Sequence, residues 1–156
     1  MPGREDYILK FIALLRQAIA QIVKYRTTGR YNEALDAALQ AQEKLFARPT
    51  AELAGLSLEE MLRLLRLDET PAAGDEKILG YAALLRETGL VYAAIDRIES
   101  AQSCFQLSLH VMLTVATVQK APAPETLDAL RDLLDRIPPA QLHPPVRELL
   151  QQVGAV

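Results

Sequence analysis

The stretch from Ile78 to Val118 constrains the fold most, because it reads as two long helices joined by a short turn. Leu85 and Gly89 lie on the first helix, and Ala101 and Phe105 lie on the second, so that small and large residues alternate at helical spacing. Small residues allow two helices to approach closely, and large residues fill the gap between them. The spacing predicts an antiparallel pair with Gly89 and Ala101 at the close approach.

The second helix of this pair carries no charged side chain between Ala101 and Gln119. A membrane span is excluded, because glutamine, serine, threonine and histidine make the segment too polar. At 100° per residue, two sides of the helix are apolar and the remaining arc is polar but uncharged, unlike an ordinary solvated face. We call this the uncharged arc, and it consists of Gln102, Gln106, His110, Leu113 and Thr117.

Interface centres are depleted in charge, so the uncharged arc is predicted to bind a protein partner. A second copy of the chain is the first candidate, because symmetric dimers are the commonest oligomers. The alternative is that the arc belongs to the core of a compact monomer, with the C-terminal helices packed across it.

Composition favours helices throughout the chain. Leu and Ala supply 50 of the 156 residues, whereas Asn occurs once, a balance that disfavours a turn-rich β fold. Cys104 is the single cysteine, which excludes an intrachain disulfide and indicates a cytoplasmic protein. The net charge of −3 argues against nucleic acid as a partner. We expect an all-α fold of antiparallel helical pairs, with about six to seven helices.

The helix expected over residues 5–27 has a broad apolar face, which suits packing against more than one neighbour. Its side chains form two parallel ridges: Ile8, Ile12, Leu15, Ile19 and Ile22, and beside them Tyr7, Phe11, Leu14 and Ala18. Gly29 is predicted to end this helix in the left-handed conformation.

Breaks in periodicity divide the expected single domain, residues 1–156, into four blocks. Ser57 and Glu60 form a capping box at the start of a short linking helix. The segment 68–74, which contains Pro71, is predicted to be a linker, with Asp75 capping the next helix. The blocks are a helical pair at 5–47, the linking helix at 57–67, the central pair at 75–119 and the C-terminal helices at 124–153.

Both helical pairs show one pattern of small and large residues, which is that of a tetratricopeptide repeat. The chain resembles an uncharacterised bacterial family of tetratricopeptide-like all-helical proteins, a domain of unknown function. The resemblance implies a fold of stacked helical pairs, an α-α superhelix, and carries no activity. It is carried by residues 6–8, 29–35, 58–62 and 84–109.

Tetratricopeptide proteins that clamp a partner's terminal carboxylate place asparagine and lysine on the first helix of each repeat. The matching positions here hold Ile19 and Val23 in the first pair, and Arg86 and Leu90 in the second. The carboxylate clamp is therefore absent. Any groove is expected to be apolar and suited to a helix or to self-association.

Residues with catalytic or metal-binding chemistry are sparse. His110 and His143 lie 33 residues apart without a spaced carboxylate or cysteine, and Cys104 has no base at helical spacing. No metal, cofactor or catalytic residue is predicted. We expect a non-enzymatic scaffold or protein–protein interaction module that self-associates as a homodimer. The alternative is a small-ligand-binding protein or enzyme with a pocket between the pairs, converging on Tyr81, Tyr92 or His110.

Overall fold

The computed structural model describes residues 2–119 and 122–154, with side chains from Tyr7 onward. This part of the chain is helical and contains no strand, as the sequence predicts. None of its helices is long and apolar enough to cross a membrane. The helices are α1 (Pro2–Thr27), α2 (Tyr31–Phe46), α3 (Thr50–Leu53), α4 (Leu58–Arg66), α5 (Pro71–Ala94), α6 (Ile98–Ala116), α7 (Pro124–Arg136), the 3-10 helix η1 (Pro139–Gln141) and α8 (Pro144–Val153).

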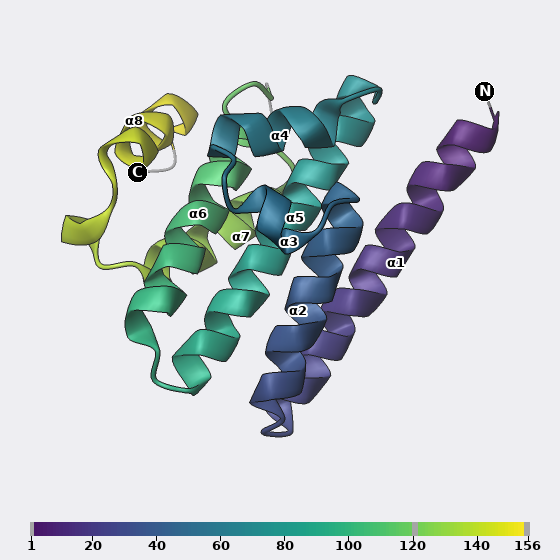
Figure 1. Cartoon of the computed structure of the whole chain (residues 1–156). Helices are drawn as coiled ribbons and strands as arrows, with labels where there is room; N and C mark the ends of the chain where they lie inside the picture. The colour runs from purple at the N-terminus through teal and green to yellow at the C-terminus, as the bar shows by residue number, and fades with distance from the viewer. Residues whose placement is uncertain (1, 120–121, 155–156) are drawn as a thin grey trace.

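Helices α5 and α6 form the centre of the molecule, and their mutual contact is the largest between any two helices (Figure 1). Helices α1 and α2 pack against α5 on one side, while α7 and α8 pack against α6 on the other. Helix α4 lies across the end of α5 and also contacts α2. The central position of α5 explains why its apolar residues lie almost all the way round.

The α5–α6 pair is antiparallel and closely packed. A Cβ atom on Gly89 would lie 2.6 Å from the Phe105 ring and 3.1 Å from Cys104 Cβ, so only glycine fits this contact. Two turns earlier on α5, the Ala82 carbonyl accepts a buried hydrogen bond of 2.6 Å from the Ser108 hydroxyl. The predicted close approach at Gly89 is confirmed, and Ala101 is buried one turn before Phe105.

A second small core joins α1, α2 and α5. Ile22 of α1 and Leu84 of α5 are buried there against the alanine face of α2, formed by Ala34, Ala38 and Ala41. The small alanine side chains let α2 approach both neighbours, as ridge-into-groove packing requires. Gly29 ends α1 with φ of 78°, which confirms the predicted left-handed cap.

The helix boundaries agree with the sequence except around α5. Ser57 caps α4 as predicted, because its hydroxyl oxygen accepts a hydrogen bond from the Glu60 backbone N–H at 3.1 Å. Helix α5, however, begins at Pro71 and not after Asp75, since Thr70 is its cap and accepts from the Ala73 N–H. The expected linker 68–74 is therefore half helical. Gly74 is buried against Arg66 at the end of α4.

Candidate interaction groove

The uncharged arc of α6 is covered by the C-terminal segment of the same chain. Leu113 is fully buried and Gln106 is 5% exposed. The Gln102 amide donates to the Arg136 carbonyl at 2.9 Å, and the Gln106 amide donates to the Gln141 carbonyl at 2.6 Å. These carbonyls end α7 and η1, where helix geometry leaves acceptors without a partner. The glutamines of the arc thus donate hydrogen bonds to carbonyls of the same chain. Gln106 and Leu113, which the sequence predicted to contact a partner, are buried in this structure.

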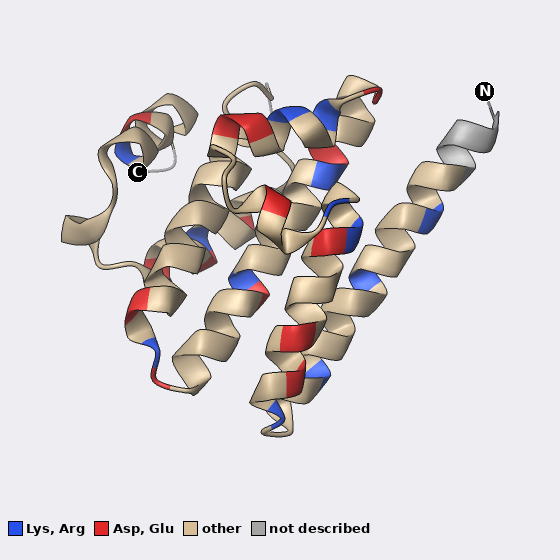
Figure 2. Ribbon diagram, in the orientation of Figure 1, with Lys and Arg blue, Asp and Glu red and all other residues tan. Residues whose placement is uncertain are grey.

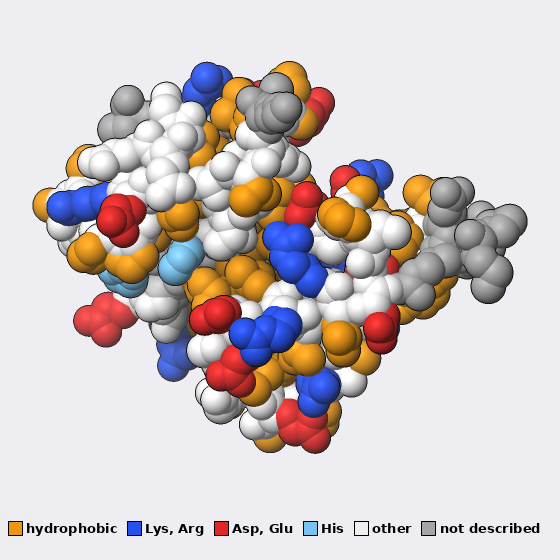
Figure 3. All heavy atoms as spheres, turned by 90° about the horizontal axis from the view of Figure 1, so that it is seen from above, with side chains coloured by type: hydrophobic (Ala, Val, Ile, Leu, Met, Phe, Trp, Pro, Cys, Tyr) orange, Lys and Arg blue, Asp and Glu red, His pale blue; other side chains and the backbone are white. Residues whose placement is uncertain are grey.

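The other two residues of the arc also make internal contacts. The Thr117 hydroxyl donates to the Leu113 carbonyl at 2.9 Å. His110 lies close to His143, the N-cap residue of α8, and the two histidine side chains are neighbours on one face (Figure 3). Partial burial, and then the nearby His143, lower the pKa of His110. The two histidines lie 33 residues apart in the sequence, so their proximity could not be predicted. The Gln106 side chain helps to hold His143 in place, because its oxygen accepts a hydrogen bond from the His143 backbone N–H at 3.4 Å.

An apolar groove lies between the N-terminal half of α1 and the C-terminal half of α2, with a volume of about 450 Å³. Tyr7 and Leu14 form its rim and are 55% and 65% exposed, whereas Leu15 and Leu45 are buried at its base. We call this the α1–α2 groove. Its full lining is Tyr7, Phe11, Leu14, Leu15, Gln17, Ala18, Ala41, Lys44 and Leu45.

Helix length explains why the α1–α2 groove is left uncovered. At 1.5 Å per residue, the 26 residues of α1 extend about 15 Å further than the 16 residues of α2. The first turns of α1 therefore extend past the end of α2 at the edge of the molecule (Figure 1). The ridge formed by Tyr7, Phe11, Leu14 and Ala18 packs against α2 at Ala18, whereas its residues Tyr7 and Leu14 remain exposed. The double apolar ridge of this helix is the sequence feature that indicates the site.

Two lysines lie at the α1–α2 groove. Lys44 is the one charged side chain in its lining. The Lys77 ammonium group lies 4.9 Å from the centre of the Phe11 ring and pairs with Glu69 at 3.1 Å. A cation over an aromatic face is favourable, so Lys77 fixes the ring that forms one wall.

A second open groove, of about 340 Å³, runs over α5 between α1 and α7. Its walls and floor mix apolar residues with Arg16, Glu76 and Glu125. Gly80 lies on its floor, where a Cβ atom would come within 2.4 Å of the Leu15 side chain. Its large aliphatic residues are already packed against one another, so it offers less free apolar surface than the α1–α2 groove.

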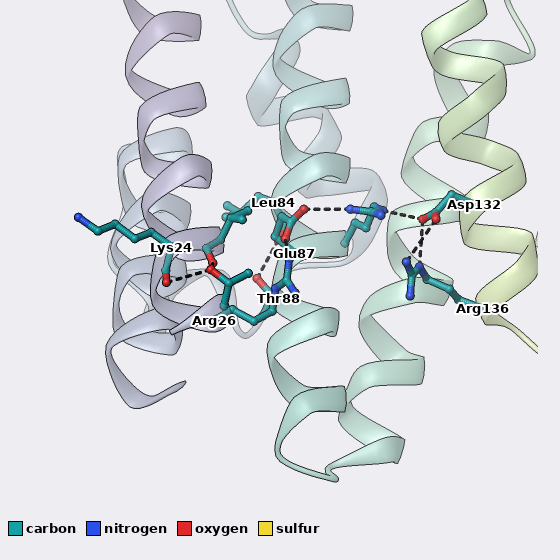
Figure 4. A network of polar contacts seen from close by, with 10 residues as sticks. Lys24, Arg26, Leu84, Glu87, Thr88, Asp132 and Arg136 are labelled. Carbon is teal, nitrogen blue, oxygen red and sulfur yellow. Dashed lines mark hydrogen bonds and ion pairs between the residues drawn. The ribbon is translucent and has the colours of Figure 1, made fainter. Parts of the chain in front are cut away.

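A ladder of charged side chains joins α1, α5 and α7 (Figure 4). Glu87 of α5 is 8% exposed and accepts from Arg26 of α1 at 3.4 Å and from Arg86 at 2.9 Å. Arg86 in turn donates to Asp132 of α7 at 2.7 Å, and Asp132 also accepts from Arg136 at 3.0 Å. The Arg86 hydrogen bond is the main reason why the pKa of Asp132 is lowered. The carboxylates are paired, so the ladder serves as a structural tie.

The residues considered for an enzymatic pocket lie at different places in the described part of the structure. Tyr81 is buried against Phe46, and burial raises its pKa to about 12. Tyr92 lines a shallow groove between α2 and α5 together with Cys104, whose pKa is raised by burial to about 11. A protonated thiol and a protonated phenol are poor nucleophiles and bases at neutral pH. His110 lies elsewhere, beside His143.

Among the side chains that the structure describes, in residues 7–119 and 122–154, no group of three or more potential metal ligands occurs. No family model, curated protein or solved structure matches the chain. The candidate binding surfaces are therefore compared by their geometry alone. The α1–α2 groove ranks first, because it combines large exposed apolar side chains with a preformed hollow.

Proposed function

We propose that the protein is a non-enzymatic protein–protein interaction module that holds a helix of its partner in the α1–α2 groove. The observation that carries this proposal is the exposed apolar rim of Tyr7 and Leu14 above the buried base of Leu15 and Leu45. Apolar grooves between helices are a common binding site for amphipathic helices. The shape and lining of the groove support a helix as its occupant.

The test compares proteins captured from lysate of the native host by the unmodified chain and by two variants. Leu14→Glu places a charge on the rim, and Ile98→Glu is the matched control, because Ile98 is 57% exposed at the start of α6. A partner retained by the unmodified protein and Ile98→Glu but lost by Leu14→Glu supports the proposal. Capture that does not depend on Leu14 contradicts it.

Self-association is the form of binding that the sequence favours, and it now requires another surface than the uncharged arc. Tyr7, Leu9 and Leu14 are exposed apolar side chains on one helix, α1, and could contact a second copy. Light scattering over the micromolar range tests this directly. A dimer that Leu14→Glu dissociates would place the second copy in the α1–α2 groove.

The alternative is a small-ligand-binding protein, and the shallow groove beside Tyr92 is its best site. This groove has a volume of about 330 Å³ and includes Leu39, which is 47% exposed. Small-ligand sites usually enclose most of the ligand and carry a few convergent polar groups. The open shape of this groove favours the interaction module.

A further inference from the structure

The dimensions of the α1–α2 groove fit one helix of a partner. This inference about the kind of helix rests on the proposed function. On α1 its lining runs from Tyr7 to Ala18, a length of about 17 Å or three helical turns. A docked helix presents anchors at positions i, i+4 and i+7, which span about 10 Å and therefore fit within the length of the groove. Leu14 of α1 lies at the rim and Leu45 of α2 at the base, so the apolar stripe of a docked helix can contact residues of both helices.

The surroundings of the groove select the charge of that helix. Over residues 7–27, α1 carries the basic side chains Lys10, Arg16, Lys24 and Arg26 and no acidic one (Figure 2). On the other wall, Lys44 is the only charged residue of the lining. A helix lying in the groove would thus have basic groups beside it on both sides.

The basic groups beside the groove differ in whether another side chain of the described residues already pairs with them. Arg26 and Lys77 have carboxylate partners, Glu87 and Glu69. Lys10 and Lys44, in contrast, form no ion pair with any side chain of the described range 7–119 and 122–154. Lys44 belongs to the lining on the α2 side. Lys10 is exposed on α1 and lies seven residues before the lining residue Gln17, so Lys10 and Gln17 are on the same side of the helix.

We propose that the α1–α2 groove binds an acidic amphipathic helix, in which Asp or Glu residues flank an apolar stripe and face Lys10 and Lys44. A second copy docking through α1 is disfavoured, because it would bring the basic residues of two α1 helices together. Charge complementarity of this kind raises the association rate and excludes partners of the wrong sign.

The test is a selection from a displayed library of random 18-residue helical peptides, with the full chain as target. Selected peptides are then measured by fluorescence anisotropy against the unmodified protein, Leu14→Glu, Lys44→Glu and the control Ile98→Glu. Lys44 is exposed, so its reversal leaves the core intact, and circular dichroism verifies folding. We expect acidic peptides with apolar residues at i, i+4 and i+7, whose binding weakens as salt rises.

Lys44→Glu should weaken these peptides by about three- to tenfold and strengthen versions with Lys in place of Glu, whereas Leu14→Glu should abolish binding. The acidic-helix proposal would be overturned, and the proposed function would stand, if the peptides lost binding to Leu14→Glu but had no excess of Asp and Glu. The same conclusion would follow if Lys44→Glu did not change their affinity. A selection that yields no binder, or only binders unaffected by Leu14→Glu, would overturn both. A dimer dissociated by Leu14→Glu would replace the acidic helix with a second copy.

Discussion

At the scale of single residues, Gly89 gives the sharpest prediction. Gly89→Ala adds a Cβ atom 2.6 Å from the Phe105 ring, and it should destabilise the fold by about 1–3 kcal/mol, partly offset by the better helix propensity of alanine. Gly55→Ala is the control, because nothing lies within 4 Å of a Cβ atom there. Urea denaturation measures both variants. Equal stability of Gly89→Ala and the unmodified protein would refute the close packing.

Cys104 is predicted to be an inert thiol. Burial raises its pKa to about 11, so at pH 8 the folded protein holds almost no thiolate, which is the reactive form. Alkylation by iodoacetamide at pH 8 should be at least about tenfold slower in the folded protein than in urea. It should accelerate as the pH rises towards 11. Rapid labelling of the native protein at pH 8 would instead identify Cys104 as a functional thiol.

The role of a single residue could be predicted from the sequence where the residues that it contacts are close to it in the chain. Ser57 and Glu60 form a local cap, and Gly29 ends α1 by its own backbone freedom, so both were predictable. The pairing of His110 with His143 was not, because it depends on where η1 and the turn before α8 direct the chain. The same is true of Glu87, whose partner Arg26 lies 61 residues away.

At the scale of helices, hydrophobic periodicity predicted α1, α2, α4, α6, α7 and α8 closely. The start of α5 was wrong because Pro71, Ala72, Ala73 and Gly74 have the composition of a linker. Proline is favourable at the first position of a helix when a capping residue such as Thr70 precedes it, and tertiary contact with α4 orders the rest. Helix α3 and η1 are too short to show periodicity.

The ladder between helices predicts how stability depends on pH. Because Arg86 lowers the pKa of Asp132, this carboxylate contributes stability above its unfolded-state pKa, and the contribution is lost as pH falls below about 4. Asp132→Asn should lower stability at pH 7 and reduce the acid-side loss. Asp128→Asn, exposed on the same helix, is the control. Urea midpoints between pH 7 and pH 3 test this, and parallel pH profiles for Asp132→Asn and the unmodified protein would contradict it.

At the scale of the whole molecule, a helical wheel can show that one face of a helix is not an ordinary solvated face. It does not show whether another part of the same chain or a partner packs on that face. Helix α6 has an uncharged third side, and the wheel is equally compatible with a second copy and with the chain's own C-terminal segment. In the structure, two glutamines of this side donate hydrogen bonds to the carbonyls that end α7 and η1, so the C-terminal segment covers this part of the helix. Tyr7, Leu9 and Leu14 bring three of the exposed large apolar side chains together on α1, which is longer than the helix that packs beside it.

Glutamate substitutions at two leucines separate these two surfaces. Leu113→Glu buries a charge without a partner, because Leu113 is fully enclosed, so the protein should lose its cooperative thermal transition or most of its stability. Leu14→Glu, at a position 65% exposed, should change the melting temperature by less than about 2 °C, since exposed substitutions shift stability by roughly 0.5 kcal/mol or less. Circular dichroism during heating measures both. If Leu113→Glu instead kept its helicity and only halved the molar mass, the uncharged arc would be an interface between copies and the C-terminal helices would not cover it in solution.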